Sequence, residues 1–188
     1  GASGLSSAYI AEKLDYYGAT LQTLATQRNT YITLYSANRY FFDILPLLCK
    51  LVVSPDFPEE EFRTLKERNR QALSVDLMKV NVLASRIFSE QLFGAENPYG
   101  KSEQLADYDT LTTAHLREFH SRYYTAEQCR IVLSGRITPE MKAAVKETFA
   151  AVPSRSESER FLFPAIHSSN EHYRFVEKAG ALQAGIRV

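Results

Sequence analysis

Two histidines on one predicted helix, His115 and His120, are the first candidates for metal chemistry. Histidines that bind zinc together from one helix stand four residues apart, because side chains at i and i+4 lie on the same face. A spacing of five turns the two side chains about 140° apart around the helix axis. His167 and His172 repeat this spacing. We therefore expect neither pair to hold zinc, and we interpret these histidines as exposed or half-buried side chains.

The cysteines, the glycines and the consecutive acids do not complete a site either. Cys49 and Cys129 lie in apolar segments without a CxxC partner or a clustered histidine. We expect two buried free thiols, with a single disulfide as the alternative. Residues 94–100 contain two glycines but lack the lysine of a phosphate-binding loop, so they predict a tight connection. Residues 59–61 are three acids that point in different directions on a helix, which indicates a solvated helix start.

Charge and composition exclude two broad classes of protein. The 22 Lys and Arg residues balance 22 Asp and Glu over 188 residues, so the formal net charge is zero. A dedicated nucleic-acid-binding protein has a strong positive field, and we therefore expect no nucleic-acid partner. The longest apolar stretch, residues 41–53, is interrupted by Asp43, Pro46 and Lys50. It is shorter than the roughly 20 residues of a membrane-spanning helix, so we expect no membrane span.

The first part of the chain predicts a helix, a hairpin and a second helix. The first helix runs through Tyr17, with a serine at its start and Gly18 after its end. Residues 20–26 and 30–36 are rich in Thr, Tyr and Leu and predict the two strands of a hairpin. Residues 39–53 predict a largely buried helix that carries a proline near its start or at a kink.

The remainder of the chain alternates helical and extended patterns. A long helical pattern begins at the acids after Pro58 and reaches Leu92, and its length predicts a bend near residues 79–81. Thr112 and Thr138 stand before further helices as caps. Polar residues fill 153–163. The extended segments predict buried or alternating strands at 128–134, 172–177 and 182–188. Together these patterns predict a mixed sheet covered by helices.

Eight short segments, taken in order, resemble the insulinase/pitrilysin family of zinc peptidases, which includes mitochondrial processing peptidase. Each segment is short, but their order and spacing match the family over nearly the whole chain. The resemblance implies an α+β half-domain whose mixed, mainly antiparallel sheet is covered by helices on one face. The matching segments are residues 10–19, 57–62, 83–86, 92–94, 97–100, 116–119, 123–124 and 131–135.

The resemblance also implies a domain organisation. Proteins of this family have two homologous halves, and the match lies in the first. Residues 1–152 would form most of that peptidase-like half without its N-terminal part. Residues 153–170 would be a linker, and residues 171–188 would be strands that lead into the second half.

The function that the resemblance implies depends on the zinc site of the family. An HxxEH motif supplies two histidine ligands and the catalytic glutamate, and a glutamate on the next long helix is the third ligand. The HxxEH helix would precede Gly1. A gapless alignment places Ala72 at the third-ligand position and Leu65 at that of a supporting acid. Because alanine cannot coordinate zinc, we expect no catalytic, cofactor-binding or metal-binding residue in this chain.

The resemblance therefore implies a non-catalytic family member without a cofactor in this chain. Such a protein would bind peptides and pair with a homologous HxxEH-bearing subunit, or with a second copy of itself. One alternative is an active zinc endopeptidase in which Asp76, one helical turn after Ala72, is a shifted third ligand. That alignment requires an insertion and a deletion before Leu83, and Asp is one methylene shorter than Glu. The other alternative is a structural core subunit of a larger complex.

Overall fold

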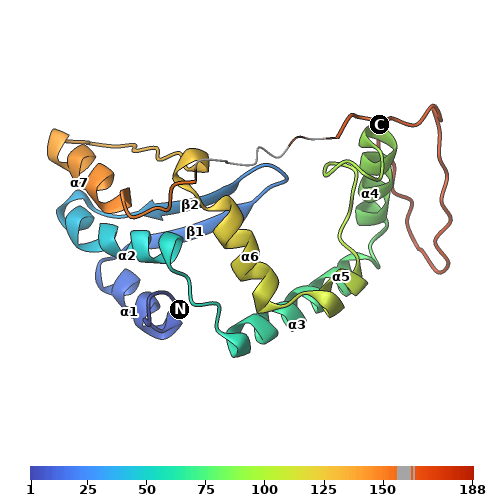
Figure 1. The fold of residues 1–188 in the computed structure, drawn as a ribbon. Helices are drawn as coiled ribbons and strands as arrows, with labels where there is room; N and C mark the ends of the chain where they lie inside the picture. The colour runs from blue at the N-terminus through green and yellow to red at the C-terminus, as the bar shows by residue number, and fades with distance from the viewer. Residues whose placement is uncertain (156–161, 163) are drawn as a thin grey trace. The chain divides into compact units, whose positions relative to one another are not determined.

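The computed structural model describes residues 1–155, 162 and 164–188, which group into two compact units (Figure 1). Unit 1 consists of residues 1–59 and 112–159, and unit 2 of residues 60–111 and 160–188. Helices predominate, and the described strands form one two-stranded antiparallel sheet, which confirms the predicted α+β class. None of the described helices has the length and apolar character that crossing a membrane requires.

Unit 1 begins with a capped helix and a β-hairpin. The backbone N–H of Tyr9 donates a hydrogen bond of 3.2 Å to the Ser6 hydroxyl, which caps α1 (Ser7–Tyr16). The strands β1 (Thr20–Ala25) and β2 (Thr30–Tyr35) pair so that the first residue of each lies opposite the last residue of the other. The helix and the hairpin both form where the sequence predicts them.

The core of unit 1 is the contact between α2 (Phe41–Val53) and α7 (Pro139–Phe149). Ile44 is 1% exposed, and the thiol of Cys49 donates a hydrogen bond to the carbonyl of Thr148 at 3.2 Å. Apolar burial of this kind is the main stabilising contribution to a fold of this size. We refer to the buried side chains of this contact as the α2–α7 seam: Ile44, Leu45, Cys49, Met141 and Val145.

Both cysteines are free, as the sequence analysis expects. Cys49 is buried and Cys129 is half-buried. Burial raises the pKa of each thiol above its usual range, because the thiolate loses contact with water. A raised pKa reduces the thiolate fraction, so the environment of these cysteines favours packing over nucleophilic chemistry.

The helix α6 (Thr113–Tyr123) is followed by irregular chain where a strand was predicted. Thr112 caps α6 as expected, and a 3₁₀ turn (Ala126–Gln128) follows the helix. Residues 128–134 belong to no strand, and Val132 is 85% exposed. Their composition favours β structure, but a strand also needs a neighbour in register. Among the described residues, β1 and β2 pair with each other and residues 128–134 pair with neither, so this prediction is wrong.

Unit 2 contains three helices: α3 (Glu59–Asp76), α4 (Val80–Phe93) and α5 (Leu105–Thr110). The bend predicted near residues 79–81 is a break between α3 and α4. Lys79 stands in an extended conformation there, with φ −87° and ψ 125°, and α4 begins at the next residue. The long helical pattern in the sequence therefore corresponds to two helices.

The described residues after 163 form no strand. Predicted strands at 172–177 and 182–188 are absent, although the chain there lies beside α4. The Ser169 amide donates a hydrogen bond of 2.7 Å to the Gln91 carbonyl, and Arg187 donates one to the side chain of Ser85. The alternating pattern of these segments is therefore present without the sheet neighbour that strand formation needs.

The predicted linker, residues 153–170, falls partly outside the described residues, since these omit 156–161 and 163. The assignment of residues 1–152 to a first half and of 171–188 to the start of a second half stays a prediction. The division into units 1 and 2 is a description of contacts within this chain.

Replacing Ile44 by alanine should lower the free energy of unfolding by roughly 2–5 kcal/mol, because the side chain is buried and its removal leaves a cavity. Urea unfolding followed by circular dichroism measures this loss. The control is Leu24→Ala in β1, where the side chain is 60% exposed and a change within about 0.5 kcal/mol is expected. Equal losses in the two variants would contradict the placement of the core in the α2–α7 seam.

Candidate functional site

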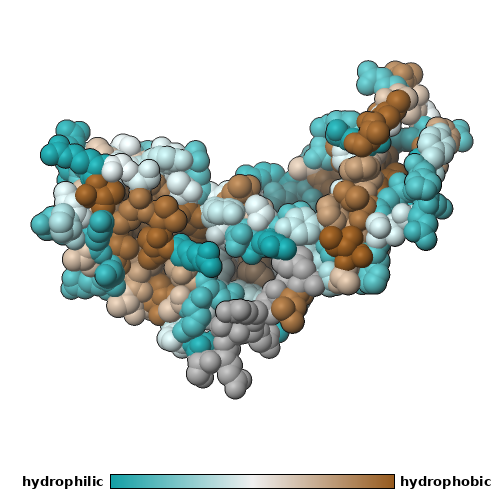
Figure 2. Space-filling view, turned by 90° about the horizontal axis from the view of Figure 1, so that it is seen from above, coloured by the Kyte–Doolittle hydropathy of each residue, from teal (hydrophilic) through white to brown (hydrophobic). Residues whose placement is uncertain are grey.

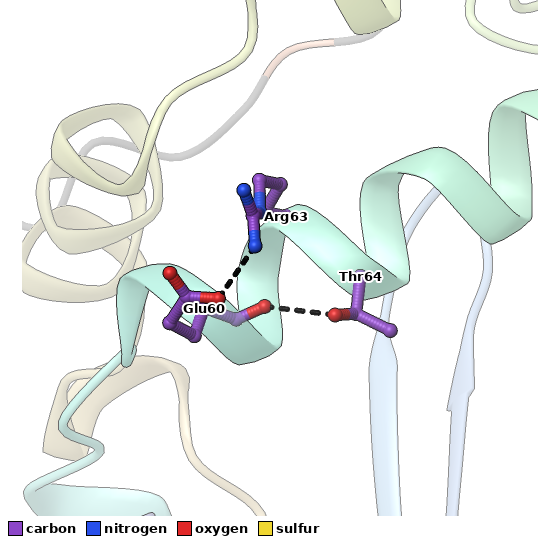
Figure 3. Close-up of polar contacts among 3 residues, drawn as sticks. All are labelled: Glu60, Arg63 and Thr64. Atoms are coloured by element: carbon purple, nitrogen blue, oxygen red, sulfur yellow. Dashed lines mark hydrogen bonds and ion pairs between the residues drawn. The ribbon is translucent and has the colours of Figure 1, made fainter.

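The helix that carries Ala72 and Asp76 begins in an acidic first turn. Glu60 forms an ion pair of 2.7 Å with Arg63, and the hydroxyl of Thr64 donates a hydrogen bond of 3.0 Å to the Glu60 carbonyl (Figure 3). The paired side chains are 83% and 64% exposed, so their attraction contributes only about 0–1 kcal/mol. Negative charge at this end of α3 also interacts favourably with the helix dipole. The geometry is that of a helix start in solvent.

A second network fixes the entry to α3 within unit 1. Thr113 is 6% exposed, and its hydroxyl donates a hydrogen bond of 2.7 Å to the Glu59 carboxylate. Arg117 donates to the Thr113 hydroxyl at 3.1 Å and to the carbonyl of Phe57 at 3.4 Å. Phe57 has a positive φ of 48°, which is strained for a residue with a side chain. The spacing of Thr113 and Arg117, four residues apart on one helix face, is the only local sign of this network in the sequence.

Ala72 presents a methyl group at the position where a zinc ligand was considered. The residue is exposed on α3, while its neighbour Leu73 is 5% exposed and points into unit 2. Leu65 and Val75 are 46% and 48% exposed and lie on the same side of the helix as Ala72. This side of α3 therefore carries no donor atom at residues 65, 72 or 75.

Asp76, the alternative ligand, is engaged in a local ion pair. Its carboxylate lies 2.7 Å from Lys79 Nζ, and the Lys79 amide donates to the Asp76 carbonyl at 3.0 Å. A negative charge at the C-terminal end of a helix is unfavourable, and Lys79 offsets it. His167 and His172 are exposed residues of unit 2. In the described part of the chain, no three His, Cys, Asp or Glu side chains gather as metal ligands. The described residues around Ala72 and Asp76 thus do not complete a zinc site by themselves.

His115 and His120 have separate structural roles, in agreement with their spacing. The Thr112 amide donates a hydrogen bond of 3.3 Å to His115 Nδ1, so this histidine helps to cap α6. His120 Nε2 donates to the carbonyl of Val52, 2.7 Å away at the end of α2, and its ring lies 4.6 Å from that of Tyr124. The His120 contact joins two helices far apart in the sequence, which no local pattern could indicate.

Glu127 ties two segments of unit 1 together. Its carboxylate accepts hydrogen bonds from the hydroxyl of Ser154 and from the Arg155 amide, the latter at 3.1–3.2 Å. The Ala126 amide donates to the Pro153 carbonyl beside them. The hydroxyl of Ser154, then the amides of Glu127 and Arg155, stabilise the charged carboxylate and lower the pKa of Glu127 to about 2.

Replacing Ser154 by alanine should move the pKa of Glu127 upward, because it removes the largest of the stabilising hydrogen bonds. A carbon-detected NMR titration of the carboxyl group measures this pKa directly. The pKa is lowered in the folded state, so this carboxylate stabilises the fold above the ordinary value of 4.5, and the contribution fades as pH falls towards about 2. An unchanged pKa in Ser154→Ala would contradict the assigned cause.

The hairpin of unit 1 offers open backbone edges. Within the described residues, each of β1 and β2 has the other as its one strand partner, so each keeps an outer edge. Large apolar side chains on and near the hairpin are also exposed, and Figure 2 shows hydrophobic residues (brown) gathered on unit 1, at the left of the view. An open edge can pair with an extended peptide through main-chain hydrogen bonds. Exposed side chains on the two strands are Leu24, Tyr31 and Tyr35.

Solved structures of peptidase-like proteins share this fold. The peptidase M16 inactive domain from Pseudomonas fluorescens matches with a TM-score of 0.75 and 23% identity, over 85% of this chain and 40% of that one. A protease from Helicobacter pylori matches with a TM-score of 0.72 and 14% identity, over 89% and 40% of the two chains. Pitrilysin matches with a TM-score of 0.62 and 19% identity, over 84% and 18%. This chain thus spans well under half the length of each.

Sequence comparison points to the same group. No significant match was found among curated proteins. Residues 110–184 match the family described as the peptidase M16 inactive domain. This stretch includes three of the segments that carry the resemblance, residues 116–119, 123–124 and 131–135. Residues 110–184 are thus similar to the peptidase M16 inactive domain, and the solved structures that share the fold include a protein of that description and pitrilysin.

Proposed function

We propose that this chain belongs to a non-catalytic M16 protein, which binds extended peptides and pairs with a homologous HxxEH-bearing subunit or with a second copy of itself. The observation that supports the proposal is Ala72, an exposed methyl group at the position that the gapless alignment assigns to the family's third zinc ligand. Catalytic zinc needs three protein ligands and one open position. Loss of one ligand removes the geometry on which water activation depends.

The structure also argues against the shifted ligand. Asp76 would have to leave Lys79, with which it forms an ion pair of 2.7 Å, and both side chains are about half exposed. Such a pair is weak, so its cost alone would not prevent metal binding. The neighbouring positions Ala72 and Val75 add no donor atom, so Asp76 would depend on the HxxEH histidines for the other protein ligands.

Peptide binding is supported by the open edges of the hairpin. An extended peptide beside β1 or β2 would form hydrogen bonds mainly with the backbone, which gives affinity with little sequence selectivity. The exposed side chains Leu24, Tyr31 and Tyr35 offer apolar contact to the same ligand. This combination suits a subunit that handles many peptides and leaves cleavage to its partner.

Metal analysis tests the non-catalytic assignment. The full-length protein, loaded with zinc, desalted and analysed by plasma mass spectrometry, should hold far less than one zinc per chain at this position. Asp76→Ala should leave the zinc content unchanged, as should the control Asp109→Ala on α5. Stoichiometric zinc that is lost in Asp76→Ala and kept in the control would overturn the proposal and favour the shifted ligand.

Peptide binding by strand addition has its own test. A fluorescent peptide of about ten residues, rich in Val and Thr, should bind, and N-methylation of alternate residues should weaken binding at least roughly tenfold by removing backbone donors. The methylation should matter for one set of alternate residues only, because just one edge of the peptide faces the hairpin. Equal affinity for all three peptides would contradict strand addition and leave side-chain contacts as the source of binding.

A further inference from the structure

The end of α4 is covered by a segment from the C-terminal part of unit 2. The last carbonyls of a helix lack partners within the helix. Here the Gln91 carbonyl accepts a hydrogen bond of 2.7 Å from the Ser169 amide. The Gln91 side chain contacts Glu171 at 3.4 Å, and Arg174 lies 3.8 Å from the Glu90 carboxylate. Residues 164–174 therefore run beside the last turn of α4, and we name them the strap.

The loop after α4 holds the beginning of the strap. Asn97 is 3% exposed, and its Nδ2 donates a hydrogen bond of 3.0 Å to the carbonyl of Pro164. Its Oδ1 accepts a hydrogen bond of 3.0 Å from the Tyr99 amide, which shapes the loop itself. Gly94 lets the strap approach, because a Cβ there would lie 2.9 Å from the His167 carbonyl oxygen. The buried Asn97 side chain thus accepts a hydrogen bond within the loop through Oδ1 and donates one to the strap through Nδ2.

The strap is held by polar contacts, with little burial of its apolar side chains. Ile166 and Tyr173 are 62% and 79% exposed. The ion pair between Arg174 and Glu90 joins side chains that are 42% and 48% exposed, so it adds about 0–1 kcal/mol. A hydrogen bond contributes about 0.5–1.5 kcal/mol, and removal of a partner from a buried polar group costs more. The buried bond of Asn97 is therefore the strongest single attachment.

We propose that residues 164–174 form a detachable strap on α4, latched by the Asn97 side chain, which can open while the loop and helices of unit 2 stay folded. Opening frees the Gln91 carbonyl and the Glu90 carboxylate at the end of α4. The latch is then a conformational device that sets how often the end of α4 opens to solvent.

The substitution Asn97→Asp tests the latch selectively. A carboxylate keeps the acceptor for the Tyr99 amide but replaces the Nδ2 donor with an oxygen that repels the Pro164 carbonyl. Hydrogen exchange of the 188-residue chain, read by NMR, should show the Ser169 amide exchanging roughly tenfold faster. The Gly100 and Lys101 amides, which donate to the Asn97 carbonyl at 2.8 Å, should keep their rates. Asn69→Ala, at an exposed asparagine of α3, is the control and should change none of these rates.

Two results would overturn the proposal. Unchanged exchange at Ser169 in Asn97→Asp would show that the side chain does not hold the strap. Equal acceleration at Ser169, Gly100 and Lys101 would show that loop and strap open as one body. If Asn97→Asp does not fold, hydrogen exchange of the wild-type chain tests the proposal instead. Its Ser169 amide should exchange through a local opening, at a rate insensitive to low urea and faster than that of the Gly94 amide, which belongs to the end of α4.

Discussion

The apolar contact between α2 and α7 is the interaction on which the described structure most depends. This contact includes Ile44, the most completely buried large apolar side chain. The hairpin and α6 belong to the same compact unit. Unit 2 differs from unit 1 in how few apolar side chains it buries. Among its described residues, Leu73 is the one buried hydrophobic side chain, and α4 buries none. Ordering a residue costs about 1–2 kcal/mol of backbone entropy, so unit 2 relies more on polar ties that each contribute little. Unit 2 is therefore the part of the chain where local opening is least costly.

The elements that the sequence predicts well are those that depend on nearby residues. Ser6, Thr112 and Thr138 cap their helices because a hydroxyl and an amide three residues later suffice for the bond. The hairpin needs only two strands and a short turn. The predicted strand at residues 128–134 did not form, because a third strand must be aligned in register with a neighbouring strand and composition does not reveal that alignment.

Some features of the candidate site can likewise be predicted from residue type and spacing, whereas others depend on contacts between distant residues. That Ala72 has no donor atom follows from residue type alone, and so does the mismatch of His115 and His120 with zinc spacing. The partners of these residues do not follow from local patterns. The bond from His120 to the Val52 carbonyl spans 68 residues, and that from Asn97 to the Pro164 carbonyl spans 67. Such contacts join segments through the fold, and an isolated histidine or asparagine in the sequence looks the same with or without them.

Alanine at residue 72 has a physical consequence for the surface of α3. A carboxylate at residue 72 would need a cation or water, whereas a methyl group between the exposed Leu65 and Val75 extends an apolar stripe along α3. Asp76 at the end of the same helix can then pair with Lys79 and support the break before α4. In the proposed non-catalytic role, the backbone edges of the hairpin and its exposed apolar side chains would be the means of binding a peptide.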